Sequence, residues 1–131
     1  MSQYWKIVRL GVVAVLVFDT AASFASKGIG FSYGYASIGS VFIYAMIGYF
    51  AFRQWGVGRA VGAAVLVELV DATLGWFISW QIGPGALPAD QVSTPIIVSA
   101  LVFVFIFAVL CALIGSAIAR VLHGPRSSNN A

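Results

Sequence analysis

The chain has 131 residues, of which 61% are hydrophobic and only 8% are charged, and its mean hydropathy is +0.99. Soluble domains carry about 25% charged residues, so this composition excludes a water-soluble fold. The net charge of +3 is spread along the chain and forms no cluster or stripe, which argues against nucleic-acid binding.

Four apolar stretches are long enough to cross a bilayer, because roughly 20 apolar residues span its hydrocarbon core as a helix. The runs do not alternate as membrane strands would, so helices are predicted. The fold class is therefore all-α, a four-span transmembrane helix bundle in a single domain, residues 1–123, followed by a disordered cytoplasmic tail, 124–131. The predicted spans are residues 7–25, 33–52, 60–82 and 95–122.

The first stretch also resembles a secretory signal peptide. Lys6 and Arg9 precede an apolar run, 10–18, and small residues follow up to Ala25. Cleavage after Ala25 would leave three spans. Asp19 interrupts the apolar region, which favours a helix that is retained.

The basic residues indicate the orientation, since cytoplasmic loops are enriched in lysine and arginine. With four spans, only Lys27 falls on one side, together with Asp90. The other side receives Lys6, Arg9, Arg53, Arg59, Arg120 and Arg126. Both termini are therefore predicted to be cytoplasmic, and the short loops indicate a bacterial inner (plasma) membrane. Aromatic residues near the two interfaces fit the same topology: Tyr4, Trp5 and Trp55 inside, and Tyr33, Trp76 and Trp80 outside.

The first and third spans are similar in sequence. Residues 9–17 and 59–67 both start with arginine and are identical at five of nine positions. This similarity favours two helical hairpins, 7–52 and 60–122, repeated in parallel orientation. The alternative is chance, because alanine, valine and leucine recur in any membrane helix.

Three acidic residues lie deep inside the spans. At about 1.5 Å per residue, Asp19 is ten residues beyond Arg9, and Glu68 and Asp71 are nine and twelve beyond Arg59, so all three fall near the midplane. An acid there costs about 2.5–3.5 kcal/mol, and the spans contain no basic partner at this depth. The acids must then be protonated or hold a monovalent cation, which makes Asp19, Glu68 and Asp71 candidate proton- or cation-binding residues.

Tyr44 in the second span reaches the same depth, and Tyr44 and Thr73 are candidate hydrogen-bond partners of the acids. The alternatives are that Tyr44 is a packing residue and that Thr73 bonds the backbone of its own helix. Small and polar residues form stripes that let helices approach closely and bond across, so we expect the stripes to face one another. They comprise Asp19, Ser23 and Ser26; Tyr33, Ser37, Ser40, Tyr44 and Gly48; and Ala64, Glu68, Asp71, Gly75, Ser79 and Gly83. Residues 101–110 of the fourth span are apolar all round, which predicts contact with lipid or with another subunit.

The sequence offers few residues for metal binding or catalysis. A single cysteine, Cys111, and a single histidine, His123, provide neither a zinc site nor a nucleophile–histidine pair, so no metal, cofactor or enzymatic activity is predicted. We expect a proton- or cation-coupled transporter or channel protomer that forms a homo-oligomer or binds a membrane-protein partner in the lipid bilayer. The alternative is a non-catalytic accessory or assembly subunit of a larger membrane complex, in which the acids hold helices together. The first is favoured, because asparagine or glutamine would hold helices together at lower cost.

Overall fold

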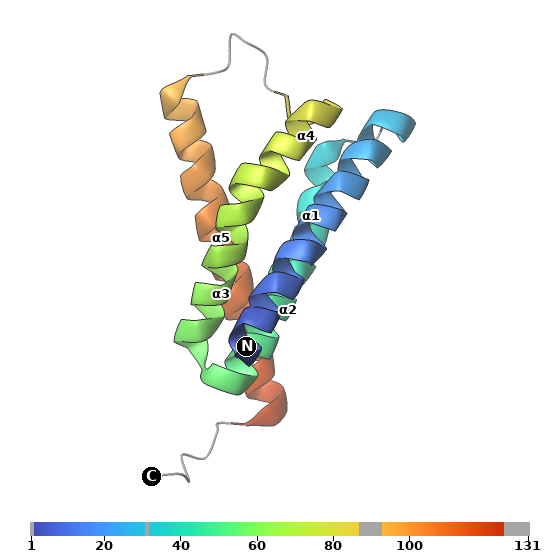
Figure 1. The fold of residues 1–131 in the computed structure, drawn as a ribbon. Helices are drawn as coiled ribbons and strands as arrows, with labels where there is room; N and C mark the ends of the chain where they lie inside the picture. The colour runs from blue at the N-terminus through green and yellow to red at the C-terminus, as the bar shows by residue number, and fades with distance from the viewer. Residues whose placement is uncertain (1, 31, 87–92, 125–131) are drawn as a thin grey trace.

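The structure is a computed structural model that describes residues 2–30, 32–86 and 93–124 (Figure 1). These residues are helical almost throughout and include no strand, which confirms the predicted all-α fold class. In chain order the elements are α1 (Gln3–Ile29), the 3-10 turn η1 (Tyr33–Tyr35), α2 (Ala36–Trp55), α3 (Val57–Val70), the π-helical turn η2 (Asp71–Gly75), α4 (Trp76–Ile82) and α5 (Thr94–His123). Asp90, Arg126 and the predicted tail beyond Gly124 lie outside the described residues.

Among the described residues, four helical segments are long and apolar enough to cross a membrane, as predicted. They are Gln3–Ile29, Tyr33–Trp55, Val57–Ile82 and Thr94–His123, each slightly longer than its predicted span. The third segment is one continuous rod built from α3, η2 and α4 (Figure 1). Large apolar side chains such as Leu10, Phe42 and Phe103 are exposed on the outside, as expected where a protein faces lipid instead of water.

Glycine ends the first two spans. Gly30 closes α1 with a left-handed φ of 72°, and its N–H donates to the Ser26 carbonyl. Gly56 has a φ of 84° and alone separates α2 from α3. A side chain would strain both conformations, whereas glycine adopts them freely. Pro95 stands in the first turn of α5, where its missing N–H is not needed.

The tightest packing in the bundle joins α2 to the second half of α5. A Cβ built on Gly48 would overlap the backbone of Ala112, and a Cβ built on Gly115 would overlap the backbone of Ala45. The two helices therefore approach through glycine on both sides, and small residues of this kind drive association in membranes by close van der Waals contact. The apolar core around this contact comprises Val8, Val15, Tyr44, Ile47, Ala51, Ala60, Ala63, Ala64, Val67, Ala108, Cys111 and Ala112.

The first half of α5 diverges from the rest of the bundle. Every buried residue of α5 lies at Ala108 or beyond, although the helix begins at Thr94. Figure 1 shows this half leaning away from α4, so that the two helices form a V. The two hairpins thus pack differently, since α2 lies against α1 while α5 leaves α4. The internal repeat stays a prediction from the sequence.

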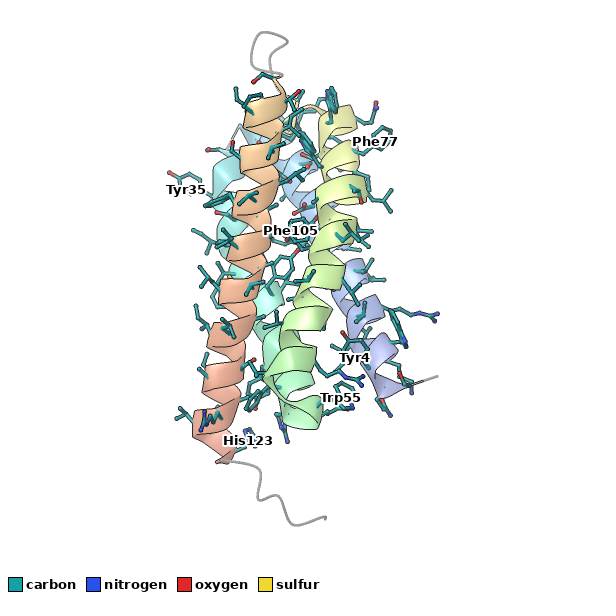
Figure 2. All side chains as sticks on the ribbon, turned by 90° about the vertical axis from the view of Figure 1, so that its left-hand side faces the viewer. Tyr4, Tyr35, Trp55, Phe77, Phe105 and His123 are labelled. Carbon is teal, nitrogen blue, oxygen red and sulfur yellow. The ribbon has the colours of Figure 1, made fainter. Side chains whose placement is uncertain are left out.

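The opposite end of the bundle, where α1 begins and α5 ends, is closed by aromatic contacts. The rings of Tyr4 and Trp55 meet edge to face at 5.6 Å, and the Arg59 guanidinium lies 5.3 Å from the centre of the Tyr4 ring. Figure 2 shows Tyr4 and Trp55 at this end. We call it the basic end, because Lys6, Arg9, Arg53, Arg59 and Arg120 gather there. The V formed by α4 and α5 opens at the other end.

Candidate functional site

The three membrane acids come together between α1 and the third span. Asp19 lies on α1, Glu68 near the end of α3, and Asp71 at the start of η2. A Cβ built on Gly75 would touch Asp71 Oδ1 and lie 3.4 Å from Asp19 Oδ2, so these two carboxyl groups adjoin. They are close enough to share a hydrogen bond when one of them carries a proton. Glu68 is only 4% exposed, and its charge acts on Asp19.

Tyr44 lies against the acids from α2. Its hydroxyl donates to Asp71 Oδ2 at 3.1 Å, and its side chain is only 1% exposed. The other oxygen of the same carboxyl, Asp71 Oδ1, is buried and has no hydrogen-bond partner among the described residues. A buried polar oxygen without a partner is costly, and binding a proton or a donor would relieve that cost.

Thr73 does not join the acids, and its prediction as their partner is wrong. Its side chain is exposed, and its hydroxyl donates to the carbonyls of Leu69, at 2.8 Å, and Val70, at 3.1 Å. Thr73 follows Asp71 by two residues, and residues two apart in a helix do not share a face. The hydroxyl therefore bonds its own helix on the outer side of the bundle.

The turn that contains Asp71 is π-helical. η2 runs from Asp71 to Gly75 and has one more residue per hydrogen-bonded turn than an α-helix, a feature found frequently at functional sites. Gly75 is buried at the end of this turn. Because it has no side chain, the Asp71 carboxyl fits beside it and reaches Asp19.

A second polar group, which sequence reasoning did not assign to the site, continues from the acids toward the V. The Ser23 hydroxyl of α1 donates to the Ser79 hydroxyl of α4 at 3.1 Å, and both residues are buried. The Tyr33 side chain interacts with Asp19, Ser23 and Ser79. The sequence had placed Ser23 and Ser79 on polar stripes, Ser23 four residues after Asp19 and Ser79 eight residues after Asp71. This spacing is the signal that could have assigned them to the site. Tyr33 was placed both on the polar stripe of the second span and in the aromatic belt.

The opposite direction, toward the basic end, is apolar. Val15 lies one turn before Asp19, and Ala64 and Val67 precede Glu68; all three are fully buried. With Ile47 they form a dry core below the acids. In the described part of the chain, the hydrogen-bonding groups next to the acids therefore extend toward the open end of the V, and the residues toward the basic end are apolar.

Two cavities meet at the acids, where α5 diverges. One has a volume of about 300 Å³ and lies beside η2 and α4, lined by Trp76 and Leu101 among others. The other has a volume of about 320 Å³ and lies between α2 and α5, lined by Phe103 and Phe107. Both are also lined by Asp19, Tyr33, Glu68, Asp71 and Val104. We call the two together the α5 cleft. Figure 2 views the molecule from the α5 side.

The charged side chains that line the α5 cleft are all acidic. The interactions of Asp19, Glu68 and Asp71 are with one another and with tyrosine hydroxyls, and no lysine or arginine of the described residues takes part. Within the same part of the chain, no three His, Cys, Asp or Glu side chains are placed to hold a metal ion. The arrangement is suited to binding protons on adjoining carboxyl groups.

Fold and composition together define an integral membrane protein with four helical spans. The chain matches no protein-family model, no curated protein and no solved structure.

Proposed function

We propose that the chain is one protomer of a proton- or cation-coupled transporter or channel, with Asp19, Glu68 and Asp71 as the coupling site. The observation that carries this proposal is the meeting of three carboxyl groups at the inner end of the α5 cleft without a basic partner. Ionisable residues inside membrane spans are expensive and typically mark ion pathways and proton relays.

The closeness of the Asp19, Glu68 and Asp71 carboxyl groups supports proton binding at this site. Carboxylates that adjoin in a poorly solvated site repel one another, so they do not all ionise together. Asp19 and Asp71 can share one proton, and Tyr44 stabilises the second oxygen of Asp71. A cation that reaches the acids replaces such a proton, which provides a physical basis for coupling.

The hydrogen-bonding groups next to the acids lead toward one end of the bundle. This supports exchange of protons or cations with one side of the membrane at a time. Tyr33, Ser23 and Ser79 connect the acids with the open end of the V, whereas the core around Val15 and Val67 closes the route to the basic end. By the distribution of lysine and arginine, the basic end and both termini are cytoplasmic in a bacterial inner membrane. In this state the acids are then accessible from the outside.

The exposed first half of α5 supports assembly with further copies. Its outer face presents the exposed side chains of Ile96, Val102 and Ile106 to the bilayer, beside the α5 cleft. A four-span protomer encloses little volume alone, so we expect a homo-oligomer. Transport of this kind requires no enzymatic step and no nucleic acid.

Substituting Asp71 tests the proposal. Proteoliposomes that contain a pH-sensitive dye would be driven by a potassium diffusion potential, and proton flux would be recorded. Asp71→Asn should reduce the flux to that of protein-free liposomes, because an amide does not exchange a proton at this position yet still accepts the bond from Tyr44.

The matched control is Thr73→Val, which alters an exposed side chain in the same turn and should leave the flux unchanged. Size-exclusion elution and helix content would be compared for all three proteins, so that misfolding is recognised. Flux that persists in a folded Asp71→Asn variant would contradict the proposal.

A second candidate is an accessory or assembly subunit of a larger membrane complex. It is favoured by the bonds from Tyr44 to Asp71 and from Ser23 to Ser79, which join α1, α2 and the third span as structural contacts would. This candidate predicts a stoichiometric partner of different mass in native mass spectrometry from mild detergent. It also predicts that Asp71→Asn releases that partner. A pure homo-oligomer would contradict it.

A further inference from the structure

We infer that the α5 cleft binds a lipophilic organic monocation, an ammonium group on an aromatic or aliphatic body, as the cargo exchanged against protons. This inference rests on the proposed function and specifies its substrate class.

The size and walls of the cleft fit an organic body. Its two parts have volumes of about 300 and 320 Å³, at the lower limit of the range typical of small-molecule sites. Trp76 and Leu101 line one part, and Phe103 and Phe107 line the other. Apolar walls with a few polar groups at one end are the usual form of a small-molecule pocket.

The charge at the inner end of the cleft selects a cation. The titratable groups that face Asp71 are Asp19 from α1, Tyr33 from η1, Tyr44 from α2 and Glu68 from α3. The residues of α5 that line the cleft are all apolar. An anion would meet only negative charge there, and a neutral molecule would gain nothing from the acids.

An organic cation fits this site better than a coordinated metal ion. Among the described residues no three His, Cys, Asp or Glu side chains are placed to hold a metal ion. Apart from the acids and a few hydroxyl groups, the walls of the cleft are apolar and would not replace the hydration shell of a small metal ion. A substituted ammonium is weakly hydrated, and its charge is also attracted to aromatic faces such as that of Trp76.

Two carboxyl groups at the inner end of the cleft can face such a cation: that of Asp71, and that of Glu68, which also interacts with the Tyr44 hydroxyl. Asp71 Oδ1 is buried without a hydrogen-bond partner, and the carboxyl belongs to a residue that lines both parts of the cleft. Glu68, 4% exposed, lines both parts as well. An ammonium group placed between these carboxylates would compensate buried negative charge that no protein cation neutralises.

The divergence of α5 provides lateral access. Because the buried residues of α5 begin only at Ala108, its first half leaves the cleft open at the depth of the hydrocarbon core. Amphipathic cations concentrate in bilayers through their apolar parts. They can therefore reach the acids sideways from the membrane.

The test compares three probes on the protein in lipid nanodiscs by isothermal titration calorimetry. Benzyltrimethylammonium should bind, whereas neopentylbenzene, its uncharged carbon analogue, and benzenesulfonate should not bind measurably. Asp71→Asn should weaken binding of the cation by about tenfold or more, as expected when a contact to a charged group is lost. Thr73→Val should have no effect. Affinity should fall as the pH is lowered, because protons compete for the same carboxylates.

If Asp71→Asn does not fold, Trp76→Leu provides the second variant and should weaken binding of the cation through loss of the aromatic face. Absence of cation binding, or equal binding of neopentylbenzene, would overturn the inference. Proton flux that still depends on Asp71 would then leave the proposed function intact. Cation binding that is independent of pH, in a protein without proton flux, would instead support the cleft and contradict the proposed function.

Discussion

Replacing Gly48 with leucine is expected to force α5 away from α2 and to lower the free energy of unfolding by about 1–3 kcal/mol, the usual cost of overpacking. A Cβ at Gly48 would overlap the backbone of Ala112, and a backbone cannot rotate out of the way as a side chain can. Gly115→Leu should have a similar effect, because its Cβ would meet the backbone of Ala45. Loss of helix content would be followed by circular dichroism during denaturant titration in mixed micelles.

The control for this prediction is Gly58→Leu. Gly58 lies in α3 with nothing within 4 Å of a built Cβ and has no unusual φ, so leucine there should be neutral or slightly stabilising. Equal stability of the Gly48 and Gly58 variants would show that the contact between α2 and α5 is not as close as described.

Replacing Gly75 with alanine is expected to disable the site while sparing the fold. The added methyl group would occupy the position of Asp71 Oδ1, so the carboxyl must turn away from Asp19 or from Tyr44. Displacements of this size in a functional site reduce rates on the order of tenfold to a hundredfold, and we expect proton flux to fall by that much. Helix propensity acts in the opposite direction, since alanine is favoured over glycine by about 1 kcal/mol.

Proton flux in proteoliposomes and denaturant stability would therefore be measured on the same preparations. Gly58→Ala adds the same methyl group at an open position and should leave the flux unchanged. Wild-type flux in Gly75→Ala would mean that Asp71 does not need its position beside Asp19.

Composition and periodicity predicted the four spans well, because hydrocarbon restricts single segments of this length to helices. The ends differed by a few residues, since helices continue past the hydrocarbon until a residue such as Gly30 or Gly56 ends them. The common depth of Asp19 and Asp71 followed from counting residues from the nearest arginines. Their role as a coupling site stays a prediction.

Three features were not predicted from the sequence, each for a separate physical reason. No sequence pattern marked the π turn at 71–75, whose Gly75 is buried against the Asp71 and Asp19 carboxyl groups. Thr73 bonds its own helix, the alternative that the sequence had left open, because residues two apart in a helix do not share a face. The divergence of α5 could not be predicted because residues 101–110 are apolar on all sides. In such a segment the sequence does not distinguish a packed face from a lipid-facing one.

The V between α4 and α5 also has a consequence for the surrounding lipid. Figure 1 shows that the bundle is wider at the end where α4 and α5 diverge, and the walls of the α5 cleft are mostly apolar. In a bilayer, lipid acyl chains will fill the α5 cleft whenever no ligand occupies it. A ligand that binds in the cleft must displace these acyl chains, so its apparent affinity depends on their length and unsaturation. Affinities measured in detergent and in different bilayers should therefore differ systematically.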